Sequence, residues 1–174
     1  QQAIDEGLYS MAEYLGHYQL KGIGGPIALE EAVSTFSNAS RFGKNNAATA
    51  LLGGLYLDGY YFDYHHKIEK NIELAIETLE RGSANGCSTC KWVLGDFYLN
   101  QNLTDPTTHR KGLNYLQDAA EMGFDKAQAQ LARMFMIGDG VEQDFDVAFE
   151  MASKAAAQMN ADGISAIGTM HYLG

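Results

Sequence analysis

Apolar positions in residues 127–160 repeat with the spacing of two short amphipathic helices. On the first helix, Leu131 and Phe135 share one face, with Ala132 beside them. The apolar face of the second helix consists of small residues, namely Ala148, Ala152, Ala155 and Ala156. This pattern predicts two helices that pack closely, with the second helix presenting a thin face to the first.

Glycines mark the turn between these two helices. Gly138 and Gly140 lie where the chain must reverse, and glycine adopts positive φ without steric cost. Asp144 precedes the second helix, where its carboxylate can accept hydrogen bonds from the free N–H groups of the first turn. The stretch is therefore predicted to be a helix–turn–helix unit.

The same unit recurs along the chain. A glycine or alanine follows the leucine (isoleucine in the last copy) of each first helix, at Gly16, Gly53, Gly95, Ala132 and Gly168. These anchors are separated by 37, 42, 37 and 36 residues, and a period in this range is typical of a solenoid. The extra residues fall in turns, and the largest insertion is at 60–70.

Helical patterning predicts an all-α fold, a right-handed α-solenoid of antiparallel helix pairs with about four and a half repeats. The expected helices are 3–20, 27–42, 46–57, 69–84, 88–100, 108–122, 125–137, 145–158 and 161–173. We expect a single domain over 1–174, with repeats at roughly 3–43, 44–86, 87–123, 124–160 and a partial 161–174.

Three of the second helices end in a glycine suited to a left-handed C-cap, at Gly43, Gly86 and Gly123. Met159 replaces this glycine after the fourth second helix, which leaves the geometry of that cap open.

The fourth repeat carries Leu131, Phe135, Gly138, Gly140, Val141, Asp144, Ala155 and Ala156. These positions resemble the pattern L-G-x-x-Y-x-x-G-x-G-V-x-x-D, then K-A and A-A-x-x-G, of the Sel-one-like repeat family. The third repeat keeps most of the pattern, whereas the second loses its glycine turn to the insertion and the first has Gln19 at the tyrosine position. Tetratricopeptide repeats, a related family, would step by 34 residues, so the longer period favours the Sel-one-like form.

Such arrays bind ligands on a concave surface. The resemblance implies that the helix face opposite the buried leucine and tyrosine lines an inner groove. In the first three repeats these positions are Glu13, His17, Leu20, Lys21, Ala47, Ala50, Gly54, Leu57, Asp58, Thr89, Trp92, Asp96, Leu99 and Asn100. In the last two they are Lys126, Ala129, Arg133, Met136, Ile137, Asp162, Ser165, Thr169, Tyr172 and Leu173.

Within this face we expect partner contacts at His17, Leu57, Trp92, Asp96, Leu99, Asn100, Arg133, Met136 and Tyr172. Trp92 is the only tryptophan, and tryptophan is enriched at binding hot spots. The pattern requires no large residue there, so Trp92 is either a hot spot or a residue that packs against a neighbouring first helix.

The formal net charge of −10 argues against nucleic acid as a partner, because its phosphates would repel the chain. A basic protein or peptide partner, or plain solubility, fits this charge better. The sequence contains no apolar run of transmembrane length, and no direct membrane insertion is expected.

Cys87 and Cys90 form a C-x-x-C at the expected start of a helix. A thioredoxin-like site requires a βαβ pattern beside this motif, and a zinc site requires a second pair of ligands. The sequence has neither, so the motif is interpreted as structural, with Cys90 a small buried residue where other repeats place alanine, and the bonding of the two cysteines is left open.

The insertion Tyr60–Lys70 is rich in aromatic residues and contains His65 and His66. Packing of the aromatics on the adjoining helices is the first interpretation, and partner binding is the second. A metal site is disfavoured because adjacent histidines on one loop rarely face the same ion.

No nucleophile elbow, phosphate loop or spaced histidine–carboxylate set is present. We therefore expect an adaptor or scaffold without cofactor or catalysis that holds a protein or peptide in its groove. The alternative is an enzyme, or an enzyme-bound regulator, that uses the insertion as its site.

The chain begins at Gln1 and stops inside a repeat at Gly174, so we expect a fragment or a processed form. The last helix, without a partner helix, is predicted to pair with another copy of the chain or to fray. Sequons at Asn38 and Asn102 matter only in a eukaryotic secretory pathway, and the compartment stays open between secretory, periplasmic and cytoplasmic.

Overall fold

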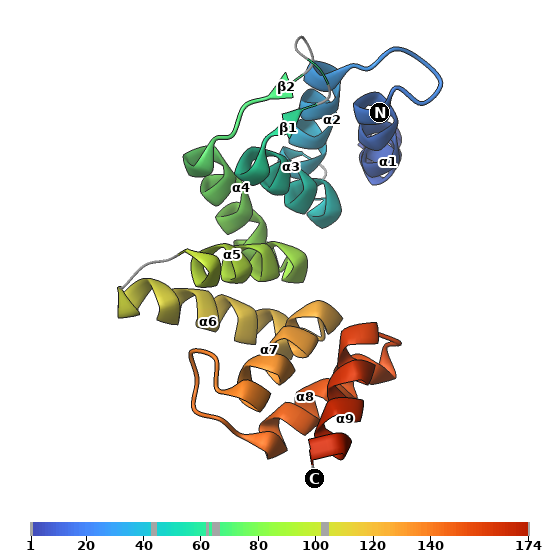
Figure 1. The fold of residues 1–174 in the computed structure, drawn as a ribbon. Helices are drawn as coiled ribbons and strands as arrows, with labels where there is room; N and C mark the ends of the chain where they lie inside the picture. Colours follow the sequence, from blue (N-terminus) through green and yellow to red (C-terminus); the bar gives the residue numbers. More distant parts are fainter. Residues whose placement is uncertain (1, 43–44, 62, 64–66, 102–104, 174) are drawn as a thin grey trace. The chain divides into compact units, whose positions relative to one another are not determined.

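The computed structural model describes residues 2–42, 45–61, 63, 67–101 and 105–173. The helices are α1 (Gln2–Lys21), α2 (Leu29–Arg41), α3 (Asn46–Asp58), α4 (Ile72–Ala84), α5 (Ser88–Asn100), α6 (Pro106–Glu121), α7 (Asp125–Ile137), α8 (Phe145–Ala157) and α9 (Ala161–Leu173) (Figure 1). Within the described residues, every expected helix is present and its ends lie within three residues of the prediction. The chain is an all-α solenoid of repeats, as predicted.

A small hairpin in the insertion was not predicted. Strands β1 (Tyr60–Tyr61) and β2 (Lys67–Ile68) pair antiparallel, with Tyr60 opposite Ile68. Strands of two residues are too short to produce a detectable alternation of apolar and polar positions.

The predicted packing of the insertion's aromatics is confirmed for Tyr60. Its ring packs against the core formed by α1, α2 and α3, and its hydroxyl donates to the Leu20 carbonyl over 3.5 Å. Tyr61, by contrast, is 69% exposed. Phe62, Tyr64, His65 and His66 lie outside the described residues.

The chain divides into two compact units, residues 1–93 (unit 1) and 94–174 (unit 2), and the boundary falls within α5. Unit 1 has a core of apolar residues that includes Leu29, Phe36 and Leu52. In unit 2, Ala132, Ala152 and Ala166 bring α7, α8 and α9 together. The organisation of 1–174 as one domain stays a prediction.

The repeated leucine–glycine pair has a steric cause. A Cβ atom at Gly16 would overlap the ring of Phe36 on α2, and one at Gly53 would overlap the side chain of Leu79 on α4. In unit 2, a Cβ at Gly95 would lie 3.0 Å from the backbone nitrogen of a residue on α6. The anchors recur because the second helix of each of these pairs approaches the first-helix backbone at this position.

The predicted turn and cap of the fourth repeat are confirmed. Gly138 and Gly140 have φ of +73° and +71°. One carboxylate oxygen of Asp144 accepts hydrogen bonds from the amides of Asp146 and Val147, each over 3.0 Å. These bonds satisfy two of the free N–H groups at the start of α8.

Met159 keeps the left-handed geometry of the glycine that it replaces, with φ of +63°. It is the only non-glycine residue of the described part of the chain with positive φ. Its side chain is 83% exposed, so it has little packing to offset the steric cost of this conformation.

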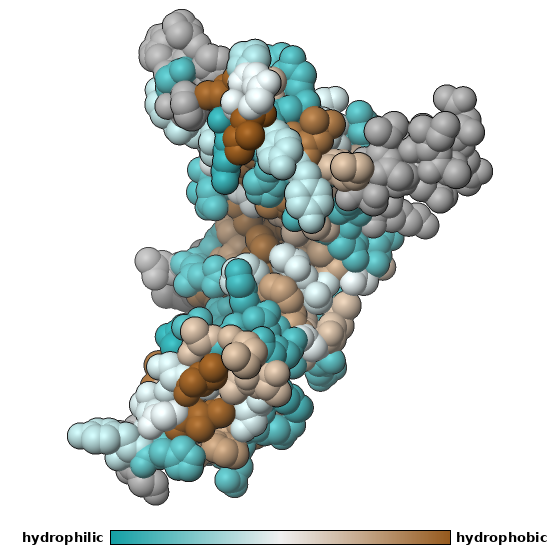
Figure 2. Space-filling view, turned by 90° about the vertical axis from the view of Figure 1, so that its right-hand side faces the viewer, coloured by the Kyte–Doolittle hydropathy of each residue, from teal (hydrophilic) through white to brown (hydrophobic). Residues whose placement is uncertain are grey.

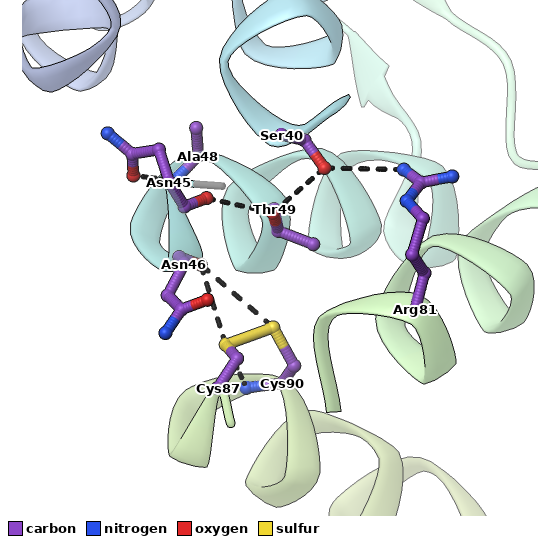
Figure 3. The surroundings of a disulfide bond; sticks show 8 residues. All are labelled: Ser40, Asn45, Asn46, Ala48, Thr49, Arg81, Cys87 and Cys90. Carbon is purple, nitrogen blue, oxygen red and sulfur yellow. Dashed lines mark hydrogen bonds between the residues drawn. A yellow bond between two sulfur atoms is a disulfide. The ribbon is translucent and has the colours of Figure 1, made fainter. Parts of the chain in front are cut away.

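The two cysteines are joined by a disulfide, with the sulfur atoms 2.17 Å apart. Cys90 is 0% exposed, which confirms the prediction that it is buried, and Cys87 is buried as well, at 1%. The sulfur atoms lie 3.5 and 3.9 Å from the carbonyl oxygen of Asn46 on α3 (Figure 3). The disulfide is buried between helices, so thiols in solution cannot reach its sulfur atoms. We therefore interpret it as a structural disulfide.

Polar side chains also connect helices inside unit 1. The Thr49 hydroxyl donates to the Ser40 hydroxyl over 2.8 Å, and Arg81 Nη2 donates to the same oxygen over 3.2 Å (Figure 3). Ser40 and Thr49 are 4% and 3% exposed, so these bonds satisfy buried groups on α2 and α3.

Candidate functional site: a groove in unit 1

Unit 1 contains a groove of about 590 Å³, which we call the unit-1 groove. Its lining comes from α1, α3 and α5, the first helices of successive repeats, and from the start of the hairpin at Gly59 and Tyr60. Figure 2 shows apolar surface set among polar residues on one face of the molecule, in the upper part of the view where unit 1 is drawn.

Small residues of α3 form part of the groove lining. Ala47, Ala50 and Gly54 line the groove from successive turns of this helix. A Cβ atom at Gly54 would meet no atom within 4 Å, so the space above this residue is open. This open space, which we call the Gly54 hollow, can accept a side chain from a bound molecule.

The walls of the groove are apolar. Leu51 and Leu55 line it from α3, Val93 lines it from α5, and Leu20 lines it from α1. Leu20 is 6% exposed and belongs to the core of unit 1 as well. An apolar side chain placed in the Gly54 hollow would therefore bury part of its surface against these residues, which favours binding.

Charged and polar residues occupy the edge of the groove. Glu13, His17 and Lys21 lie one turn apart along α1, and Asp58 is the last residue of α3. His17 Nδ1 lies 3.0 Å from the Glu13 carbonyl oxygen, and its ring meets Phe36 edge-on at 6.1 Å between centroids. These two contacts fix the orientation of the imidazole at the groove.

Nine of the expected inner-face positions line this one groove: Glu13, His17, Leu20, Lys21, Ala47, Ala50, Gly54, Asp58 and Thr89. Of the residues for which partner contact is predicted, the unit-1 groove includes His17. Leu57 is 8% exposed and belongs to the interior, and Trp92 is half-buried on α5 beside the lining residue Val93. Partner contact by Leu57 and Trp92 stays a prediction.

In unit 2, the side chain of Asp96 connects two first helices. Its Oδ1 accepts a hydrogen bond from Gln130 Nε2 on α7 over 3.0 Å. Leu99 has a different position from the one predicted, because its Cγ would lie 3.0 Å from a Cβ at Gly112 on α6. Leu99 thus packs against α6 of its own repeat, although the prediction placed it on the opposite face, and its contact with a partner stays a prediction.

The other residues predicted to contact a partner lie at the surface of unit 2. Tyr172 is 89% exposed, Asn100 and Arg133 are exposed, and Met136 is half-buried. Their contact with a partner also stays a prediction.

Leu51, Leu55 and Val93 were missing from the expected groove lining, although the sequence contains a signal for them. Leu51 lies four residues after Ala47, and Val93 lies four residues after Thr89. Residues four apart share a helix face, and the apolar stripe of a helix commonly spans 100° or more. The expected inner face was therefore too narrow, because it omitted the apolar residues beside Ala47 and Thr89.

Neither a metal site nor a membrane span is found in the part of the chain that the structure describes. There, no group of three or more histidine, cysteine, aspartate or glutamate residues could hold a metal ion. His65 and His66 lie outside these residues, so the metal hypothesis for the insertion is not tested. The described helices include none with the length and apolar character needed to cross a membrane.

Comparison with known proteins gives a repeat family and a fold. A model of the Sel1 repeat matches residues 47–87, 92–124 and 125–158. The chain is similar to the crystal structure of a Sel1 repeat protein from Oxalobacter formigenes, with 19% identity, a TM-score of 0.70 and coverage of 89% of this chain and 60% of that chain. No curated protein matches this chain.

A second similar structure is c5321, a protective antigen of uropathogenic Escherichia coli strains that displays an SLR fold. The identity is 24% and the TM-score is 0.73, with coverage of 93% of this chain and 33% of that chain. At these identities the likeness concerns the fold alone. This chain spans less than two thirds of the length of either solved protein.

Proposed function

Because this chain belongs to the Sel1 repeat family, whose repeats are generally protein–protein interaction modules, we propose that it is an adaptor that binds a peptide segment of a partner protein in the unit-1 groove. The Gly54 hollow is the observation that carries this proposal. It is an open space on a face of α3 that lines the groove, with apolar residues around it, and the fold does not fill it with another side chain.

The composition of the groove supports a peptide as the occupant. Protein interfaces combine an apolar centre with a polar rim, and a few well-buried anchor side chains provide most of the binding free energy. The unit-1 groove has an apolar centre around Gly54 and a rim that includes Glu13, Lys21 and Asp58. Small molecules also bind in cavities of roughly 300–1,000 Å³, so the test must distinguish the two.

The surfaces of α5, α7 and α9 supply further candidate contacts. Trp92 of unit 1 and Asp96, Arg133 and Tyr172 of unit 2 are proposed to contact the partner outside the groove. Each contact is proposed from the residue's predicted position on the inner face of a first helix, and it concerns only the unit to which that residue belongs.

The adaptor is proposed to act without catalysis or cofactor. Sel1 repeat proteins are a scaffold type that is typically non-enzymatic. The net charge of −10 further favours a basic partner, since opposite charge speeds association and suppresses unsuitable partners.

The test is to select binders from a random peptide library displayed on phage, with the whole chain as target. Synthetic copies of the enriched peptides are then titrated by calorimetry against the wild-type chain and the variant Gly54→Leu. A leucine at this position would fill the hollow and, since its Cβ meets no atom within 4 Å, should leave folding intact.

Gly168→Leu is the matched control, because Gly168 also lies in a helix where a Cβ would meet no atom within 4 Å. We expect Gly54→Leu to weaken binding at least about 30-fold, a hot-spot loss of about 2 kcal/mol, and Gly168→Leu to leave it unchanged. Peptides that bind Gly54→Leu as tightly as wild type would exclude the groove as their site. Failure to enrich any peptide would also contradict the proposal.

A further inference from the structure

We infer that the segment bound in the unit-1 groove is basic, with a lysine or arginine one or two residues from a bulky apolar residue that fills the Gly54 hollow. This inference rests on the proposed function and specifies its partner. The lysine or arginine would lie against Asp58 at the end of α3.

The spacing of Gly54 and Asp58 gives the geometry. They are four residues apart on α3 and both line the groove, so they lie on the same helix face, one turn apart. Neighbours at this spacing have Cβ atoms roughly 5–6 Å apart. An extended peptide rises about 3.3 Å per residue, so this distance corresponds to about two residues of the bound segment.

The electrostatics at the end of α3 favour a cation. The carbonyl end of a helix carries a partial negative charge, and Asp58 adds a full negative charge at the same place. A lysine or arginine in the last turn offsets this charge, as Lys21 does in α1, whereas the last turn of α3 contains no basic residue. Asp58 is also exposed, so its carboxylate is accessible to a bound molecule.

Two other charged groups line the groove, Glu13 and Lys21. Glu13 adds a second negative charge on the α1 side, whereas Lys21 lies at the C-terminal end of α1 and offsets the partial charge of that helix. The rim therefore carries two carboxylates and one ammonium group. Carboxylates outnumber the ammonium group, and the net charge of the whole chain is negative as well. Charge complementarity thus points to a basic segment rather than an acidic or a purely apolar one.

The experiment uses the peptides enriched on the whole wild-type chain. Their sequences should combine a bulky apolar residue with a lysine or arginine one or two positions away. Binding of these peptides is then measured to wild type, Asp58→Asn and Asp58→Lys at low and high salt. The control is Asp139→Lys, which makes the same change in net charge at an exposed turn of unit 2.

We expect Asp58→Lys to weaken binding at least about tenfold at low salt, and the loss to shrink at high salt, because exposed charges are screened. Asp139→Lys should have a much smaller effect. Replacing the basic residue of the peptide with glutamine should weaken binding to wild type but have little effect on binding to Asp58→Asn, since the pair is already broken.

The outcomes separate the two proposals. If Gly54→Leu abolishes binding but Asp58→Lys acts no more strongly than Asp139→Lys, the groove is confirmed as the site and the basic segment is wrong. Enriched peptides without lysine or arginine would also overturn the basic segment. If Gly54→Leu binds normally, both proposals fail.

Discussion

Two adjacent glycines of α3 offer a direct measurement of how closely the repeat helices pack. Gly53 faces α4, where an added Cβ would overlap Leu79, whereas a Cβ at Gly54 would meet no atom within 4 Å. The change to alanine gains about 0.5–1 kcal/mol at each position, because glycine is the poorer helix former. Only Gly53→Ala also incurs a packing cost.

The magnitude follows from the surroundings of Gly53. Leu79 is 0% exposed, so it cannot move outward to make room for a methyl group. Overpacking of a well-filled core typically costs about 1–3 kcal/mol. Since the gain in helix propensity is the same for both variants, Gly53→Ala should be less stable than Gly54→Ala by about 1–3 kcal/mol.

The assay is urea unfolding followed by far-ultraviolet circular dichroism, on both variants and wild type under identical conditions. Gly54→Ala should unfold at a higher urea concentration than wild type, and Gly53→Ala at a lower one than Gly54→Ala, with similar m-values. Equal midpoints for the two variants would refute the close approach of α4 to α3 at Gly53. A less stable Gly54→Ala would refute the open space above Gly54.

Three further predictions concern caps, pH and the inner face. Met159→Gly should raise the free energy of unfolding by about 0.5–1 kcal/mol, because it relieves the strain of a left-handed backbone. Gly123→Ala, at φ of +86°, should lower the free energy of unfolding by about 1 kcal/mol, and urea unfolding of both variants checks this. Hydrogen bonds from the side chain and amide of Thr107, and from Thr108, lower the pKa of Asp105 to about 2 from 3.8. This contribution to stability is complete above pH 3.8 and is lost as the pH falls through about 2, so Asp105→Asn should flatten the decrease in unfolding free energy over that range. Finally, Trp92→Ala should weaken peptide binding by about 2 kcal/mol or more with little change in stability, whereas Leu94→Ala, at a site 0% exposed, should cost about 2–5 kcal/mol of stability. If Trp92→Ala has a low melting temperature but binds normally, Trp92 is a core residue.

The repeats and helices could be predicted from the sequence because each depends on local chemistry. The anchor glycines recur for a steric reason that is the same in several repeats, as at Gly16 against Phe36 and Gly53 against Leu79. Asp144 caps α8 through its own carboxylate, within three residues of chain. Periodicity and turn chemistry report such features directly.

Features that depend on contacts between distant residues were not predictable in the same way. The hairpin pairs Tyr60 with Ile68, and its short strands leave no period to detect. Leu99 was placed on the inner face by helical rotation, but its contact with Gly112 depends on the approach of α6, which the sequence does not specify. The bonding of Cys87 to Cys90 is local, but a C-x-x-C spacing is compatible with a disulfide, free thiols or a metal site, so the spacing alone does not decide it.

The unit-1 groove could be predicted from the sequence only in part. Nine lining residues follow from the helix periodicity and the family resemblance, yet the hollow itself depends on Gly54 having no neighbour within reach. A sequence pattern identifies Gly54 as an inner-face residue but contains no information on the empty space above it.

The most direct test of the proposed binding site is a map of amide chemical shifts by nuclear magnetic resonance. A selected peptide is titrated into the isotope-labelled whole chain, and the residues whose amide signals move are assigned. We expect the largest changes on the residues of α1, α3 and α5 that line the groove, including His17, Ala50, Gly54 and Val93. Changes confined to α2 and α4, or to unit 2, would contradict the proposed site.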